Sequence, residues 1–132
     1  MSSEQRLHVR VPCKVKVAYE FTSWKDQDLS TIHHPIYTET TDIAMAGLGI
    51  PQIVPIDHSL EKKLIQGKEK IKMSISLYEN KPPLKVFARL VWVDLQKNVK
   101  EHSHRGGMAF IDISNDNYNN IKRFVNEHLE KN

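Results

Sequence analysis

A chain of 132 residues is long enough for one domain and too short for two domains with separate cores. Hydrophobic residues make up 39% and charged residues 27% of it, which supports a hydrophobic core and excludes global disorder. The net charge of +3 comes from Lys and Arg scattered among Asp and Glu, so the composition argues against a long nucleic acid and favours a small anionic ligand.

Membrane insertion and disulfide bonding are not expected. Residues 1 to 5 carry no apolar signal region, and no stretch approaches the ~18 to 20 apolar residues of a membrane span. We therefore expect a cytoplasmic protein. The single Cys13 has no internal partner and lies in an alternating apolar run, so we interpret it as a small buried hydrophobic residue.

The first predicted element is a strand over residues 9 to 21, where apolar residues occupy every odd position. Pro12 cannot donate a ladder hydrogen bond, so the start of this strand is expected at a sheet edge. Residues 22 to 35 follow neither a helical nor a strand period and predict a long connection. Trp24 within it is expected to fold back onto the sheet.

Extended structure is predicted again over residues 36 to 43, with a turn at 44 to 47 and a short strand to residue 50. Residues 68 to 78 alternate clearly, and this period predicts a strand with one dry and one wet face. The inward positions are Ile71, Met73, Ile75 and Leu77, and the outward positions are Lys70, Lys72, Ser74 and Ser76.

The last elements are two paired strands and a helix. Residues 84 to 95 are apolar on both faces, and residues 106 to 113 are expected to pair with them across a charged loop. Ser114 is a natural N-cap for an amphipathic helix over residues 115 to 130. We expect this helix to cover the apolar outer face of the last strands, or to pack on a partner.

Two short motifs carry the functional signal. Arg6 and Arg10 form an Arg-x-x-x-Arg pattern, whose guanidinium groups suit phosphate oxygens or the edge of a guanine. Asp42, Ala44 and Gly47 form an Asp-x-Ala-x-x-Gly pattern, which places a carboxylate acceptor beside a glycine. Together they predict a site for an anion and a guanine, without catalytic groups.

The order of these features resembles the PilZ domain, the bacterial receptor module for cyclic di-GMP. The resemblance covers the chain from about Arg6 to Leu129, and it includes the run Ala88-Arg-Leu-Val-Trp-Val93 followed by Gly106-Gly-Met-Ala-Phe110. It implies a mainly β fold, a six-stranded antiparallel Greek-key β-barrel with a C-terminal amphipathic helix. Residues 1–10 would be a flexible loop, and residues 11–132 would form the single domain.

The resemblance also implies a non-enzymatic role for each motif. Arg6 and Arg10 would hold the phosphates and guanine edges of cyclic di-GMP, Asp42 would accept from a guanine, and Gly47 would permit a turn and close approach. No cofactor besides this ligand is implied. Ordering of the N-terminal loop would then relay binding to a downstream protein partner.

The sequence departs from the family pattern at one motif position. Ala44 replaces the family's Ser, which removes a hydrogen bond worth about 1 kcal/mol, or roughly fivefold in affinity. Gln5 stands where a basic residue often accompanies uptake of a stacked ligand dimer, so one cyclic di-GMP per site is favoured.

Three other interpretations compete with ligand binding. A ligand-free adaptor would keep the barrel and act only through protein contacts. Binding of single-stranded nucleic acid would use the basic charge and Trp24. Seven histidines, including His102 and His104, invite a metal site, but no Cys or carboxylate spacing completes a ligand set and none is predicted.

Overall fold

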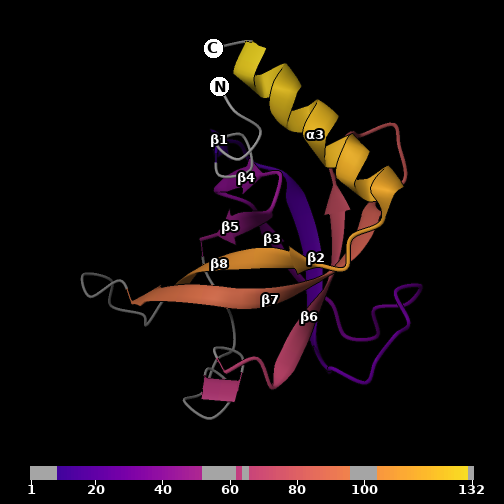
Figure 1. The fold of residues 1–132 in the computed structure, drawn as a ribbon, viewed down its shortest axis with the longest axis vertical. Coiled ribbons are helices and arrows are strands. Elements are labelled where there is room, and N and C mark those ends of the chain that lie inside the picture. Colours follow the sequence, from indigo (N-terminus) through magenta and orange to yellow (C-terminus); the bar gives the residue numbers. More distant parts are fainter. Residues whose placement is uncertain (1–8, 52–61, 64–65, 96–103, 131–132) are drawn as a thin grey trace.

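The structure is a computed structural model that describes residues 9–51, 62–63, 66–95 and 104–130. It contains an antiparallel sheet curled into a half-barrel, with one helix at the C-terminal end (Figure 1). The strands are β1 (Val11–Pro12), β2 (Lys16–Ser23), β3 (Ile36–Glu39), β4 (Asp42–Ala44), β5 (Gly47–Ile50), β6 (Glu69–Ser76), β7 (Leu84–Leu95) and β8 (His104–Ile111). The helix is α3 (Asn115–Glu130).

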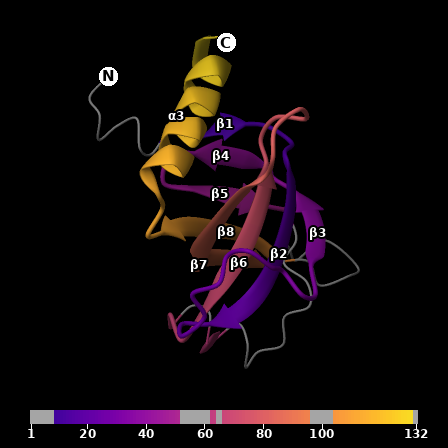
Figure 2. The same cartoon turned by 90° about the vertical axis from the view of Figure 1, so that its right-hand side faces the viewer.

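The strand order across the sheet is β1-β4-β5-β8-β7-β6-β2-β3. Figure 2 shows β1, β4 and β5 stacked in this order, with β2 and β6 running across them. The predicted pairing of the last two strands is confirmed, because β7 and β8 are antiparallel neighbours from Phe87↔Ile111 to Leu95↔His104. A register shift between Leu90 and Trp92 bends this pair.

The described residues contain eight strands, where six were expected. The predicted strand over residues 9 to 21 is divided into β1 and β2, and the extended stretch over residues 36 to 43 is divided into β3 and β4. β1 and β2 lie near opposite ends of the sheet order, and so do β3 and β4. Both divisions occur at the same place, where the two chain segments pass each other.

Thr40 organises this crossing, which we call the seam. Its hydroxyl accepts the Val15 amide proton at 3.0 Å and donates to the Cys13 carbonyl at 2.8 Å. Backbone bonds from Thr40 N to Val15 O (2.9 Å) and from Cys13 N to Thr41 O (3.3 Å) flank these contacts. The Thr40 hydroxyl thus takes the place of a backbone hydrogen bond between the two segments. This interrupts the sheet between β1 and β2 and between β3 and β4.

Cys13 is only half-buried beside the seam. Burial raises the pKa of its thiol, an effect that the contact with Thr40 partly offsets. A raised pKa favours the protonated thiol over the reactive thiolate, in keeping with a packing role.

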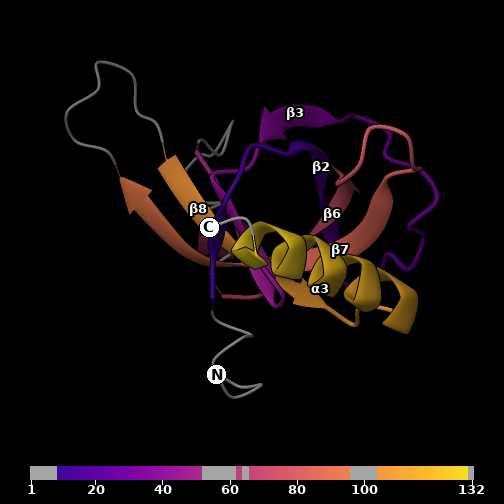
Figure 3. The same cartoon turned by 90° about the horizontal axis from the view of Figure 1, so that it is seen from above.

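The core lies inside the curled sheet and is completed by the helix. Inward-facing residues of the strands and of the segments beside them form one cluster with three helix residues: Val11, Val15, Val17, Tyr19, Ile43, Met45, Leu48, Ile50, Ile71, Met73, Ile75, Val86, Ala88, Leu90, Met108, Ile121, Phe124 and Val125. Seen from above, α3 lies across one end of the sheet (Figure 3). The helix therefore closes the interior, and the expectation that it covers the outer face of the last strands is wrong.

The helix begins where the sequence predicted. The Ser114 hydroxyl accepts the Asn117 amide proton at 3.2 Å, as an N-cap does. Near its other end, Tyr78 donates to Glu127 at 3.1 Å and packs edge-on against Phe124. Within the described residues, no helix is long and apolar enough to cross a membrane.

The outer face of β6 differs from the prediction. Lys70 and Lys72 were expected to be solvated, yet they are only 4% and 2% exposed. The connection over residues 24–35 folds across them. Lys72 forms an ion pair with Asp26 at 2.9 Å and donates to the Thr31 carbonyl at 3.0 Å. The Lys70 ammonium lies 3.5 Å from the centre of the Phe87 ring and 5.7 Å from that of Trp24, which does fold back.

Replacing Asp26 with Ala should lower the melting temperature more than replacing Lys72 with Met. Without Asp26, a buried ammonium keeps a single carbonyl acceptor, whereas without Lys72 the carboxylate is partly exposed and still bonded to Thr22. Thermal unfolding at neutral pH measures both. An equal fall in melting temperature in the two variants would contradict this prediction.

The same network predicts sensitivity to acid. Hydrogen bonds from Thr22 and then Lys72 hold the pKa of Asp26 well below its usual range. Because the folded pKa is the lower one, this stabilisation is present above about pH 4 and disappears as the pH falls further. Asp26→Ala should therefore differ less from the wild type in acid than at neutral pH.

Candidate functional site

The second motif lies on the outer face of the β4–β5 hairpin. Asp42 and Ala44 share this face, since the intervening Ile43 points into the core and is only 1% exposed. The register places Asp42 opposite Gly49 and Ala44 opposite Gly47. On the next strand, β8, Gly107 and Ala109 continue the two rows. Small residues therefore occupy this face across three strands, and all of them except Ala109 are buried, with one partly exposed carboxylate at the margin.

Arg10 reaches this carboxylate from the segment before β1. Its Nη1 atom donates to Asp42 Oδ1 at 3.2 Å and to Oδ2 at 3.3 Å. The two side chains are 45% and 24% exposed. An ion pair so exposed contributes about 0 to 1 kcal/mol, so Arg10 can exchange Asp42 for another anion at little cost. The structure thus brings one residue of each motif into contact.

Gly47 is the first residue of β5, and the turn itself is formed by Met45 and Ala46. Its backbone lies directly against β8. A Cβ atom at Gly47 would be 2.0 Å from the Met108 carbonyl oxygen. The close approach seen at this glycine is therefore between two strands of the sheet, and its predicted approach to a ligand stays a prediction.

Gly49 is a site residue that the motif alone did not indicate. A Cβ atom there would lie 2.6 Å from Asp42 Oδ1 and 2.7 Å from Thr41 Oγ1. The missing side chain gives the carboxylate room to lie over β5. The signal was present in the sequence, because a Gly-x-Gly strand in hairpin register with Asp-x-Ala places the second glycine opposite the Asp.

The remaining candidates contribute less. Ala44 is 5% exposed and has no polar side-chain atom. Arg6, His102 and the His104 side chain lie outside the part of the chain that the structure describes. Within that part, no group of three His, Cys, Asp or Glu side chains is placed to hold a metal ion.

The chain matches the model of a known protein family. The model of the PilZ domain matches residues 4–127, which includes both motifs and nearly the whole chain. No curated protein has a matching sequence.

Several solved structures share the fold at low sequence identity. The inhibitor of motility MotI/DgrA of Bacillus subtilis superposes with a TM-score of 0.62 at 13% identity, over 94% of this chain and 51% of that protein. The PilZ domain of YcgR from Escherichia coli, solved with c-di-GMP, gives 0.59 at 10% identity over 93% and 90%. The Borreliella burgdorferi PlzA protein in complex with c-di-GMP gives 0.58 at 7% identity over 98% and 55%. This chain thus spans about half the length of MotI and of PlzA.

Proposed function

This chain belongs to the PilZ domain family, and on that premise we propose that it is a non-catalytic receptor for cyclic di-GMP. The contact between Arg10 and Asp42 is the observation that carries the proposal, because it joins the two motifs on one outer face of the sheet. Two of the solved structures with this fold contain c-di-GMP, which supports the same ligand here.

The chemistry of the site suits a cyclic dinucleotide. The Arg10 guanidinium offers a planar fork to a phosphodiester or to the O6/N7 edge of guanine. The Asp42 carboxylate accepts hydrogen bonds, which matches the N–H donors on the Watson–Crick edge of guanine. Ligand phosphate would replace Asp42 as the partner of Arg10, and Asp42 would then be free to bind the base. Arg6 would add the second guanidinium.

The relay would begin at the N-terminal segment. Arg10 is the last residue before β1 and already contacts Asp42, so a ligand that bound Arg6 as well would draw the residues before Arg10 against the sheet. A disorder-to-order change of this kind creates a new surface for a partner protein. Limited proteolysis tests this step, with slower cleavage in residues 1–10 expected when cyclic di-GMP is present. Under the ligand-free adaptor alternative, cleavage is the same with and without nucleotide.

Calorimetric titration with cyclic di-GMP tests the receptor role. Because Gln5 replaces a basic residue, we expect a saturable heat at one ligand per chain, and the hydroxyl missing at Ala44 should weaken this binding by roughly fivefold. Cyclic di-AMP is the control, since adenine lacks the guanine edge that Asp42 would bind. The absence of heat with ligand on the order of tens of micromolar would contradict the proposal.

Replacing Gly49 with Ala should lower the affinity for cyclic di-GMP by about tenfold, or about 1.4 kcal/mol. The new Cβ atom would displace the Asp42 carboxylate from its place over β5. The atoms that must move are the ends of two side chains, so the melting temperature should change little. Unchanged affinity in this variant, with binding intact in the wild type, would show that Gly49 does not position Asp42.

A further inference from the structure

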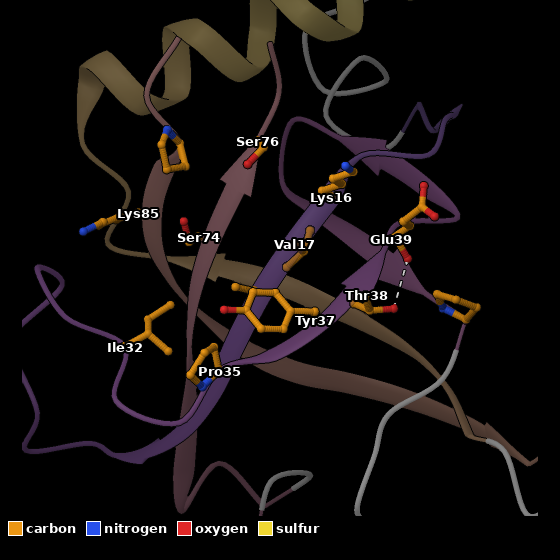
Figure 4. A pocket seen from close by; sticks show the side chains of 13 residues that line it. Lys16, Val17, Ile32, Pro35, Tyr37, Thr38, Glu39, Ser74, Ser76 and Lys85 are labelled. Atoms are coloured by element: carbon orange, nitrogen blue, oxygen red, sulfur yellow. Dashed lines mark hydrogen bonds between the residues drawn. The ribbon is translucent and has the colours of Figure 1, made fainter. Parts of the chain in front are cut away.

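A second surface lies away from the Arg10–Asp42 contact. A groove of about 890 Å³ runs over the outer faces of β2, β3 and β6 (Figure 4). The strand register sets its floor as one row across four strands, namely Tyr37 on β3, Ala18 on β2, Ser74 on β6 and Lys85 on β7. Two small residues thus lie between an aromatic side chain and a cation.

The aromatic end of the groove is open to solvent. Tyr37 is 77% exposed, the largest exposure among the big hydrophobic side chains that the structure describes. Pro35 and Ile32 also line the groove near this ring (Figure 4). Tyrosine is enriched among the residues that dominate binding at protein interfaces. This end therefore suits an apolar side chain.

Two lysines line other parts of the groove, Lys16 beside the tyrosine strand and Lys85 at the far end of the row (Figure 4). Lys85 Nζ donates to the Ser30 carbonyl at 2.7 Å, which holds its ammonium at the groove wall. Lys16 is exposed on β2, opposite Ser76 on β6. The two lysines thus flank the strip of Ser74 and Ser76, on strands about 10 Å apart. Glu39, opposite Lys16, is the one acidic residue among those that line the groove in the described part of the chain.

We propose that this groove docks an acidic segment of a partner protein. Three strand spacings, about 14 Å, separate Tyr37 from Lys85 along the row. An extended segment rises about 3.3 Å per residue, so an apolar side chain on Tyr37 and a carboxylate at Lys85 would be about four residues apart. Residues at that separation point to the same side of an extended chain. Complementary charge then fixes the direction of the bound segment.

Nucleotide binding is not a premise of this docking site. Asp42 and its neighbours lie on β4 and β5, whereas the groove lies on β2, β3 and β6. The two surfaces can therefore be altered separately, and either can fail its test without affecting the other.

The test is a titration of the labelled full chain with the peptide Phe-Ser-Ser-Ser-Glu, followed by backbone amide chemical shifts. Saturable shifts are expected at Ala18, Tyr37 and Ser74. Peptides with Lys in place of Glu, or Ala in place of Phe, should bind at least about tenfold more weakly, a difference of about 1.4 kcal/mol. Cyclic di-GMP is titrated separately, to show whether the groove takes a nucleotide instead.

Two variants of the protein complete the test. Tyr37→Ala and Lys16→Glu change exposed side chains, and each should weaken the peptide at least about tenfold while the spectrum stays that of a folded chain. Lys122→Glu, an exposed charge reversal on α3, is the matched control and should bind like the wild type. The proposal is overturned by shifts that do not saturate, by equal binding of the lysine peptide, by wild-type binding in Tyr37→Ala, or by cyclic di-GMP occupying the groove.

Discussion

Replacing Arg10 with Ala should lower the affinity for cyclic di-GMP by about ten- to a hundredfold. Hydrogen bonds to charged groups contribute about 1.5 to 3 kcal/mol, and each 1.4 kcal/mol is tenfold. The stability of the ligand-free protein should fall little, because the Arg10–Asp42 contact is exposed and long at 3.2 Å. Calorimetry and thermal unfolding together should therefore show weak binding by a chain of nearly wild-type stability.

Lys14→Ala is the control for this variant. Lys14 is an exposed cation between β1 and β2, four residues beyond Arg10, and it makes no contact with Asp42 in the described structure. We expect its affinity to stay within about twofold of the wild type. Equal losses in the two variants would show that the ligand responds to general positive charge and not to a guanidinium at this position.

Replacing Gly47 with Ala should destabilise the fold by about 3 kcal/mol, with a fall in melting temperature of about 10 °C. The new Cβ atom would lie 2.0 Å from the Met108 carbonyl oxygen, and this neighbour is backbone, so β5 and β8 would have to separate. Those strands join the β1–β4 end of the sheet to β7. Thermal unfolding followed by circular dichroism measures the loss.

Gly67→Ala provides the comparison for Gly47. Gly67 has a φ of 73°, which L residues adopt at some cost, but no atom of the described residues lies within 4 Å of its missing Cβ atom. Only backbone strain of about 1 to 2 kcal/mol is expected there. A Gly47→Ala protein as stable as the wild type would mean that the sheet accommodates the added methyl group.

Periodicity was sufficient to predict most of the fold. The alternation of residues 68 to 78 correctly placed Ile71, Met73 and Ile75 in the core, and the change of period after Ser114 correctly predicted the helix. These signals are local, because one face of a strand or helix is either buried or wet.

The errors came from contacts between distant residues. The division of two predicted strands depends on the Thr40 hydroxyl, whose partners Cys13 and Val15 are more than twenty residues away along the chain. The burial of Lys72 depends on Asp26 in a connection whose path no period indicates. The role of Gly49 could be identified only from the hairpin register, which places it opposite Asp42. In each case a tertiary contact overrode the local pattern.

The seam also has a consequence for association in solution. Sheets that end in long, flat strands offer a template for pairing with other chains, which leads to aggregation. Here the end strands of the described sheet are short, with two residues in β1 and four in β3, and Pro12 removes one amide donor from β1. A truncation that removed residues 1 to 15 would take Val11 and Val15 out of the core and leave Asp42 and Ile43 of β4 without their β1 partners. Such a chain should aggregate at concentrations where the intact protein remains monodisperse.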